Sequence, residues 1–198
     1  MIIGITGGSG SGKTTLLQLI AQQGGIVLDC DEIYHQLLSS NTALLSAIEQ
    51  RFPGTVTNGM LDRKKLGNIV FSQKQALLDL NQITHAAVKK KVIEILQSKP
   101  DLAAIDAIGL FEGDLDSICD VTVAVTAPAP ARISRIMERD SISEEYAKRR
   151  IAAQPCDEWF AQRCNVVLSN DSTPEDFTAK CLAFLDKLGI IKEKTKGE

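Results

Sequence analysis

The sequence has no uninterrupted apolar run that approaches membrane-spanning length, so we expect no transmembrane helix. It also lacks a C-x-x-C pair among its five cysteines, which argues against a zinc site and a disulfide framework and fits a reducing compartment. An excess of basic residues is missing as well, because the formal net charge at pH 7 is −3. A signal peptide is not expected, since the first predicted strand begins at residue 2. We therefore expect a cytoplasmic protein with neither a membrane nor a nucleic-acid partner.

The remaining composition is ordinary for a globular protein. Hydrophobic residues make up 44% of the chain and charged residues 24%. A length of 198 residues suffices for one well-packed domain, or for a core that carries small insertions. Composition alone therefore sets the class of the protein but not its function.

The most informative stretch is glycine-rich and lies close to the first residue. Residues 7–14 read GGSGSGKT and satisfy G-x-x-x-x-G-K-[ST] at every fixed position, between the apolar runs 2–5 and 16–20. Glycines let backbone N–H groups turn toward phosphate oxygens, and the helix that follows adds the positive end of its dipole. The alternative is a glycine-rich turn that binds nothing. The order of strand, loop and helix favours a nucleoside triphosphate site.

Two side chains of this loop have chemistry of their own. Lys13 is expected to reach the β- and γ-phosphates, and the Thr14 hydroxyl is placed to ligate Mg²⁺. The predicted ATP-binding residues of the segment are Gly8, Ser9, Gly10, Ser11, Gly12, Lys13, Thr14 and Thr15.

Two acids follow the second predicted strand, residues 26–28. In a strand the side-chain period of two would point Asp29 and Asp31 the same way, at the carboxyl end where open α/β sheets bind ligands. One carboxylate could support Mg²⁺, and the other could take a proton from an attacking hydroxyl. The alternative is that Asp31 only caps a helix that starts near residue 32. Beside a phosphate loop we favour the functional role, and the two roles can coexist.

The middle of the chain is predicted to be helical. Residues 34–48 have apolar side chains at a period near 3.6, turns follow at 52–54 and 58–59, and residues 61–71 and 77–96 predict a short and a long helix. Arg63 and His85 are candidates for ligand contact in this stretch. Lys89–Lys91 fan out by about 100° per residue, so a mostly solvated face is expected there. Residues 58–98 are therefore predicted to form a substrate-binding insertion.

Strands are expected again at 102–106, 121–125 and 165–170, the last of them at the edge of the sheet. Glu112, after the first of these, could orient a substrate group, although a surface glutamate is an equal alternative. A terminal helix is predicted over 177–188, followed by a charged, frayed tail at 192–198.

Two arginine-rich helices lie between the last two predicted strands. On the first, Arg132, Arg135 and Arg139 fall within about 60° of one another, and like charges so placed repel unless an anion or acids neutralise them. Glu138 and Asp140 could do part of this, but beside an ATP site we expect phosphate contact by at least one of the arginines. The second helix starts at Ser143, carries Lys148, Arg149 and Arg150, and ends near Gln154, before Pro155. Two such helices joined by a short turn are typical of a lid that closes over ATP and excludes water.

The ordered set of motifs resembles the dephospho-coenzyme A kinase family over nearly the whole chain. The phosphate loop alone would indicate only a P-loop protein, so the resemblance rests on the complete set. Its segments are 6–15 (TGGSGSGKTT), 29–33 (DCDEI), 59–63 (GMLDR), 70–71 (VF), 80–85 (LNQITH), 110–112 (LFE), 119–121 (CDV), 135–140 (RIMERD), 149–154 (RRIAAQ) and 170–171 (ND).

This resemblance implies an α/β fold of the P-loop NTPase/kinase type, with three layers, a parallel sheet, a helical substrate-binding insertion and a helical lid. We expect a single kinase domain over residues 1–198. Its core would comprise about 1–57, 99–127 and 158–190, with the insertion at about 58–98 and the lid at about 128–157.

The resemblance also implies a reaction, the transfer of the ATP γ-phosphate to the 3′-hydroxyl of dephospho-coenzyme A with Mg²⁺, the last step of coenzyme A synthesis. Asp31 would be the base and Asp29 its neighbouring acid, with Thr14 and Asp29 at the metal. Arg139 is the first choice and Arg149 the second for the lid arginine that contacts ATP. The implied catalytic residues are Asp31, Lys13 and Arg139, and the implied substrate-binding residues are Asp31, Arg63, His85 and Glu112. A monomer or a small homo-oligomer is expected.

Three positions depart from the usual family pattern. Ala86 follows His85 in place of a proline, Ile108-Gly109-Leu110 replaces Pro-Leu-Leu, and His35 stands where an arginine often closes the Asp-x-Asp segment. They concern the acceptor pocket rather than the phosphate-handling residues. They leave open a P-loop kinase for another small hydroxyl acceptor, such as a nucleoside or sugar acid. A nucleotide-binding regulator without transfer activity is a second alternative, although the presence of Lys13, Thr14, Asp29 and Asp31 argues against it.

Overall fold

The computed structural model describes residues 1–191, so the predicted tail at 192–198 lies outside the described residues. The chain divides into two compact units. Unit 1 comprises Met1–Leu28, Pro100–Leu110 and the described residues from Asp116 onward, and unit 2 comprises Asp29–Lys99 and Phe111–Leu115. Within residues 1–191, none of the helices is both long and apolar enough to cross a bilayer.

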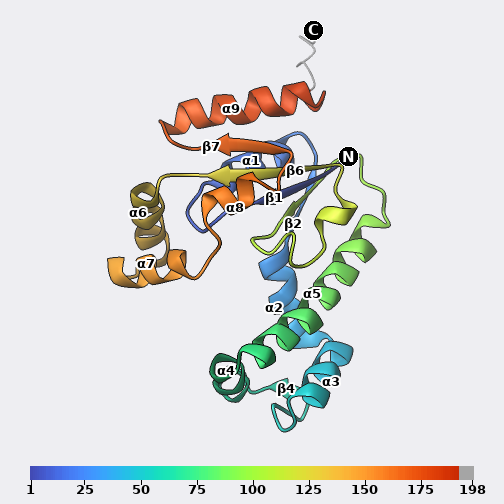
Figure 1. The fold of residues 1–198 in the computed structure, drawn as a ribbon. Coiled ribbons are helices and arrows are strands. Elements are labelled where there is room, and N and C mark those ends of the chain that lie inside the picture. Colours follow the sequence, from blue (N-terminus) through green and yellow to red (C-terminus); the bar gives the residue numbers. More distant parts are fainter. Residues whose placement is uncertain (192–198) are drawn as a thin grey trace. The chain divides into compact units, whose positions relative to one another are not determined.

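The centre of unit 1 is a five-stranded sheet (Figure 1). Its strands, in the spatial order β2-β5-β1-β6-β7, are β2 (Ile26–Asp29), β5 (Ala103–Asp106), β1 (Ile2–Thr6), β6 (Val121–Thr126) and β7 (Val166–Ser169). β1 pairs in parallel with β5 and β6, and β6 pairs in parallel with β7. The apolar, β-branched runs therefore form buried parallel strands as predicted, and β7 lies at the edge.

The helices of unit 1 lie between these strands or, for the last of them, after β7. They are α1 (Lys13–Gln22), the 3₁₀ helix η1 (Asp116–Ile118), α6 (Ala129–Asp140), α7 (Glu144–Ala152), α8 (Asp157–Ala161) and α9 (Pro174–Lys187). α7 begins after Ser143, whose hydroxyl accepts the N–H of Tyr146. α9 begins earlier than predicted because Thr173 caps it by accepting the N–H of Asp176. The five-residue helix α8 was not predicted, being too short to show an apolar period.

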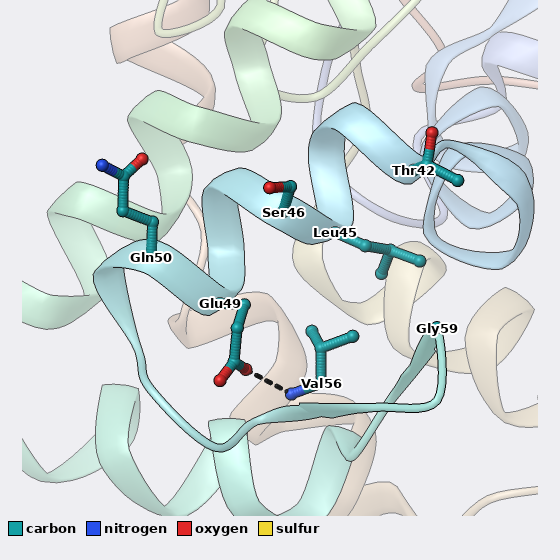
Figure 2. Close-up of a pocket in the computed structure, with 7 residues that line it drawn as sticks. All are labelled: Thr42, Leu45, Ser46, Glu49, Gln50, Val56 and Gly59. Carbon is teal, nitrogen blue, oxygen red and sulfur yellow. Dashed lines mark hydrogen bonds between the residues drawn. The ribbon is translucent and has the colours of Figure 1, made fainter.

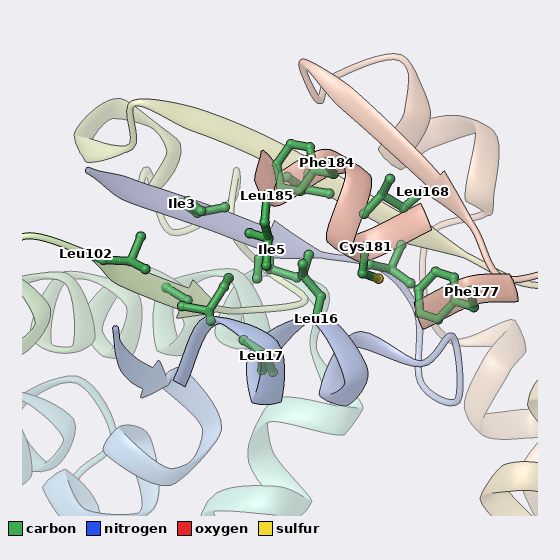
Figure 3. Packing of buried hydrophobic residues seen from close by; sticks show 14 residues of the cluster. Ile3, Ile5, Leu16, Leu17, Leu102, Leu168, Phe177, Cys181, Phe184 and Leu185 are labelled. Atoms are coloured by element: carbon green, nitrogen blue, oxygen red, sulfur yellow. The ribbon is translucent and has the colours of Figure 1, made fainter. Parts of the chain in front are cut away.

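The core of unit 1 joins the sheet to α1 and α9 (Figure 3). Ile3 and Ile5 of β1, Leu16 of α1, and Cys181 and Leu185 of α9 are all fully buried. The side chains from the three elements interdigitate, so the helix that follows the phosphate loop is fixed against the strand that precedes it.

Replacing Leu185 by Ala should lower the free energy of unfolding by about 3 kcal/mol, because the change leaves a cavity in this core. Leu182→Ala is the matched control on the same helix. Leu182 is 37% exposed whereas Leu185 is fully buried, so the control should cost under about 1 kcal/mol. Denaturant unfolding measures both, and equal losses would contradict the packing described.

Unit 2 is mainly helical. It contains α2 (Cys30–Ser40), α3 (Thr42–Arg51), the strands β3 (Val56–Thr57) and β4 (Met60–Leu61), α4 (Arg63–Ser72) and α5 (Lys74–Leu96). α2, α3 and α4 all pack on α5. The buried stripe of α5 keeps a spacing of four and consists of Ala76, Leu80, Thr84, Val88 and Val92. Among the apolar residues of the predicted helix 77–96, Leu80 and Val92 are buried, whereas Leu77, Ile83, Ala87 and Leu96 are only partly buried.

The prediction of one helix over 34–48 was wrong. The chain breaks at Asn41, whose backbone is extended and whose side chain accepts the N–H of Leu44 at 2.9 Å. An asparagine in this role satisfies a free backbone donor at the start of α3, so capping outweighs the apolar period that runs across it.

The predicted turn at 58–59 joins β3 to β4. Asn58 and Gly59 both have positive φ, as a two-residue hairpin turn requires. The Glu49 carboxylate on α3 accepts the N–H of Val56 at 2.6 Å and that of Gly54, which ties the hairpin to the helix (Figure 2). These hydrogen bonds hold the pKa of Glu49 below its usual value. A pocket lies here, lined by Thr42, Leu45, Ser46, Glu49, Gln50, Val56 and Gly59, and neither Arg63 nor His85 lines it.

Unit 2 begins at residue 29, whereas the predicted insertion began at about residue 58. The reason is that α2 and α3 pack on α5, so residues 29–57 join the helical unit rather than the sheet. The loop 111–115 joins unit 2 as well. The roles of substrate-binding insertion and lid remain predictions for these segments.

Candidate functional site

The glycine loop connects β1 to α1 in the predicted order. Gly7, Gly10 and Gly12 have φ angles of 135°, 77° and 103°, which residues with side chains rarely adopt. A Cβ atom at Gly7 would also collide with the carbonyl group of Val125. Because α1 starts at Lys13, directly after Gly12, the backbone N–H groups of its first turn lie at the loop and can bind an anion.

Lys13 lies at the carboxyl end of the sheet, beside an acid that our sequence reasoning missed. Its Nζ donates to the Gly7 carbonyl at 3.1 Å and lies 3.7 Å from Oδ1 of Asp106, the last residue of β5. Both side chains are largely buried. An acid that ends a buried parallel strand was a visible signal for this site, since P-loop enzymes hold Mg²⁺ with an aspartate of this kind.

The three arginines predicted to share one face of α6, Arg132, Arg135 and Arg139, have different partners in the structure. Arg135 Nη1 donates to the Gly10 carbonyl at 3.1 Å, and its Nη2 donates to Asn170 Oδ1 at 3.3 Å. Asn170 Nδ2 in turn donates to the Ser11 carbonyl at 2.8 Å. Arg132 also binds the loop backbone. Arg132 and Arg135 therefore hydrogen-bond to the backbone of the glycine loop. The third arginine, Arg139, is exposed.

Arg139 takes part in an ion cluster between α6 and α7. Asp140 accepts from Arg139 Nε at 2.7 Å, from Arg139 Nη2 at 2.9 Å and from Arg150 Nη1 at 2.6 Å. The hydrogen bonds from Arg139, with the charges of both arginines, lower the pKa of Asp140 to about 2. Arg150 was expected on the lid helix but was not chosen as a site residue, whereas its predicted neighbour Arg149 is exposed and lies 4.0 Å from Glu145.

Asp29, the last residue of β2, and Asp31, in the first turn of α2, have different local roles. Asp29 Oδ1 accepts the N–H groups of Asp31 and Glu32, at 2.9 and 3.1 Å, and so caps α2. Asp31 is the second residue of α2 and is exposed. The expected strand period therefore does not extend to Asp31, and the capping role considered for Asp31 belongs to Asp29. The helix starts earlier than predicted because Asp29 supplies this cap.

Two predicted acceptor-binding residues meet in unit 2. His85 Nδ1 lies 3.1 Å from the main-chain oxygen of Glu112, and one turn further along α5 Lys89 forms an ion pair with Asp114. Arg63 is the first residue of α4, after the cap Asp62, and is exposed. Burial raises the pKa of Tyr34 above its usual value, and the positive charge of Arg63 partly opposes that rise.

Unit 1 thus carries the phosphate loop, Lys13, Asp106 and the arginine cluster, whereas unit 2 carries Asp31, Arg63, His85 and Glu112. Within residues 1–191, His, Cys, Asp and Glu side chains do not gather in threes as a metal-binding cluster.

Comparison with known proteins decides the family. A model of the dephospho-CoA kinase family matches residues 1–176. The chain belongs to the dephospho-CoA kinase family. A dephospho-CoA kinase from Fusobacterium nucleatum is 36% identical over 191 residues, which cover 95% of this chain and 98% of that protein.

Two solved structures share this fold, and one of them is a dephospho-CoA kinase. The crystal structure of TT1252 from Thermus thermophilus has a TM-score of 0.79 at 32% identity, covering 95% of this chain and 97% of that one. The dephospho-CoA kinase from Campylobacter jejuni has a TM-score of 0.66 at 26% identity, with 94% and 96% covered.

Membership of the dephospho-CoA kinase family confirms three predictions from the sequence. The chain is a member of the family that its motifs resemble, and its fold is the α/β fold of P-loop kinases. The protein is an ATP-dependent kinase whose acceptor is a hydroxyl group. The roles given to single residues remain predictions, as do Mg²⁺ and the oligomeric state.

Proposed function

We propose that the protein transfers the γ-phosphoryl group of ATP to the 3′-hydroxyl of dephospho-coenzyme A, as the last step of coenzyme A synthesis. The observation that carries this proposal is the phosphate loop with Lys13 and Asp106 at its base, in a chain of this family. We further propose that it acts in the cytoplasm on small molecules, as a monomer or a small homo-oligomer, without a nucleic-acid or membrane partner.

The donor side of the reaction belongs to unit 1. Backbone N–H groups that follow Ser9 in the segment from Gly8 to Thr15 would bind the phosphates, and Lys13 would turn from the Gly7 carbonyl to the β- and γ-phosphates. Arg139 is the proposed lid arginine, with Arg149 second and Arg150 added by its place in the Asp140 cluster. Their charges would stabilise the negative charge of the transferring group.

The residues at the loop also fit a magnesium ion. The Thr14 hydroxyl and the Asp106 carboxylate are hard oxygen donors, the type that Mg²⁺ prefers, and Asp29 remains the third candidate. When bound with ATP, Mg²⁺ would neutralise charge on the phosphates. Asp106 would also keep the Lys13 ammonium oriented toward the loop.

The acceptor side belongs to unit 2. We assign to Asp31 the proton of the acceptor hydroxyl: as that oxygen forms its bond to phosphorus, the bond from phosphorus to ADP breaks and the carboxylate takes the proton. Arg63, His85 and Glu112 would position dephospho-coenzyme A. The proposal for Glu112 is supported by the contact of its main chain with His85.

Replacing Asp106 by Asn should reduce kcat by about 10–100-fold and raise the Mg²⁺ concentration needed for half-maximal rate. The KM for dephospho-coenzyme A should stay unchanged, because Asp106 lies at the phosphate loop. Asp101→Asn, which removes the same charge just before β5, is the control. A Mg²⁺ titration of initial rates measures the effect, and identical titrations for both variants would contradict the assignment.

The function is tested by ADP release from Mg-ATP with and without dephospho-coenzyme A, beside a panel of nucleosides and sugar acids. Release that depends on dephospho-coenzyme A and exceeds that with every other acceptor supports the proposal. A better substrate in the panel would move the assignment to another hydroxyl acceptor. ATP binding without acceptor-dependent release would indicate a nucleotide-binding regulator.

A further inference from the structure

Arg132 of α6 is a buried charge that faces the phosphate loop. Arg132 is 4% exposed and shares the buried face of α6 with Ile136. Nε donates to the Ser9 carbonyl at 3.0 Å, and Nη1 donates to Asp157 Oδ1 at 3.0 Å. Nη2 is also buried and has no hydrogen-bond partner among the described residues.

The Arg132 guanidinium explains why residue 8 is a glycine, which the backbone angles of Gly8 do not explain. Gly8 is absent from the positive-φ glycines, so its backbone does not demand the lack of a side chain. A Cβ atom at Gly8 would nevertheless overlap the Arg132 guanidinium, and one at Gly10 would crowd the Arg132 carbonyl oxygen. The loop is therefore shaped to receive Arg132 at two of its variable positions.

Packing alone does not require an arginine here. An unpaired N–H group costs free energy when buried, and a guanidinium costs more than an apolar side chain of the same volume. Asp157 balances part of the charge, and it is fixed in turn by the N–H of Ala127, which it accepts at 3.3 Å. The favourable free energy that offsets the rest of this cost must come from the contacts that Arg132 makes with the loop.

Ser9 links the glycine loop to Gln154 and Arg132 through hydrogen bonds. Its N–H donates to Gln154 Oε1 at 2.8 Å, its hydroxyl accepts from Gln154 Nε2 at 2.8 Å, and its carbonyl accepts from Arg132. The Ser9 N–H is engaged in this way, and the Ser11 N–H donates to the Gly8 carbonyl at 3.2 Å, so the bend at Gly8–Ser9 is fixed. The N–H groups at the start of α1, which follow this bend, can then face an anion.

We propose that Arg132 is a positioning residue for phosphate binding. Its hydrogen bond to the Ser9 carbonyl fixes the Gly8–Ser9 bend, so that the backbone N–H groups that follow are held in the arrangement that binds a diphosphate. The positive charge of Arg132, which Asp157 balances only in part, also adds positive electrostatic potential at the loop. This inference rests on the proposed use of the loop for ATP, but it does not depend on which acceptor receives the phosphate.

The test uses Arg132→Met, with ADP binding measured by calorimetry and KM measured for both substrates. The Kd for ADP and the KM for ATP should both rise by about tenfold or more, since small shifts of binding groups are costly. The KM for dephospho-coenzyme A should stay within twofold. Arg163→Met is the matched control: Arg163 is exposed, stacks on Trp159 at 4.0 Å, and should leave all three constants unchanged.

Arg132→Lys keeps the charge but cannot bridge Ser9 and Asp157, so it should lie between wild type and Arg132→Met. It also serves if the methionine variant does not fold. A folded variant at position 132 that binds ADP within twofold of wild type would overturn the inference. An equal rise of both KM values would do the same, by showing a general structural defect. If wild type bound no ADP, the proposed function would fail first.

Discussion

Asp31→Asn is expected to lower kcat by about 10²–10⁴-fold, the usual range for loss of a general base. The reason is local. Asp31 is exposed in the first turn of α2 and does not cap that helix, so its carboxylate is available to take a proton. The fold should not suffer from the change, and the Kd for ATP should remain close to wild type. Acceptor-dependent ADP release and nucleotide titration measure the two effects.

The control for this prediction is Glu32→Gln. Glu32 is the next residue of the same helix, is exposed and bonds only locally, to Gln36 in the next turn. Loss of its charge should leave kcat nearly unchanged. A rate for Asp31→Asn within tenfold of wild type would place the base elsewhere, and Asp29 would be the next candidate. Asp29→Asn would test it cleanly, because asparagine can still cap α2.

Lys13→Met is expected to lower kcat by about 10²–10³-fold, as removal of a single charge-stabilising donor does in other enzymes. Lys13 contacts the loop carbonyl of Gly7 and the acid Asp106, and these are the groups around which the phosphates would bind. The KM for ATP should rise as well, whereas the KM for dephospho-coenzyme A should not.

Stability separates this effect from damage to the fold. At 3.7 Å the pair of Lys13 with Asp106 is beyond hydrogen-bond distance and should contribute no more than about 1 kcal/mol. The free energy of unfolding should therefore change little in Lys13→Met. Lys180→Met, which removes an exposed lysine paired with Asp171, is the control for loss of charge. Full activity of Lys13→Met would contradict the assignment of the loop to ATP.

The phosphate loop was predictable because its requirements are local. Consecutive residues from Gly7 to Thr14 supply the backbone angles, the helix start and the two side chains proposed to contact phosphate and Mg²⁺. Asp106 was missed because its role depends on the strand order, which places β5 beside β1. A chain read in one dimension shows an acid after a strand, but not the lysine that lies beside it.

The arginines of α6 show a second limit. Their spacing correctly placed Arg132 and Arg135 on a common face, but periodicity does not say what a face meets. The structure places these two against loop carbonyls, so their charges act on the backbone of the loop. Helix ends were uncertain for a related reason: Asn41 and Asp29 act as caps, and a cap competes with an apolar period that continues past it.

The most direct measurement follows the phosphoryl group itself. ATP labelled with ¹⁸O at its non-bridging γ-oxygens is incubated with the protein, Mg²⁺ and dephospho-coenzyme A, and the products are analysed by mass spectrometry and ³¹P NMR. We predict coenzyme A that carries the whole labelled phosphate on its 3′-oxygen, formed in step with ADP. Label found only in inorganic phosphate, or on another position of the acceptor, would contradict the proposed reaction.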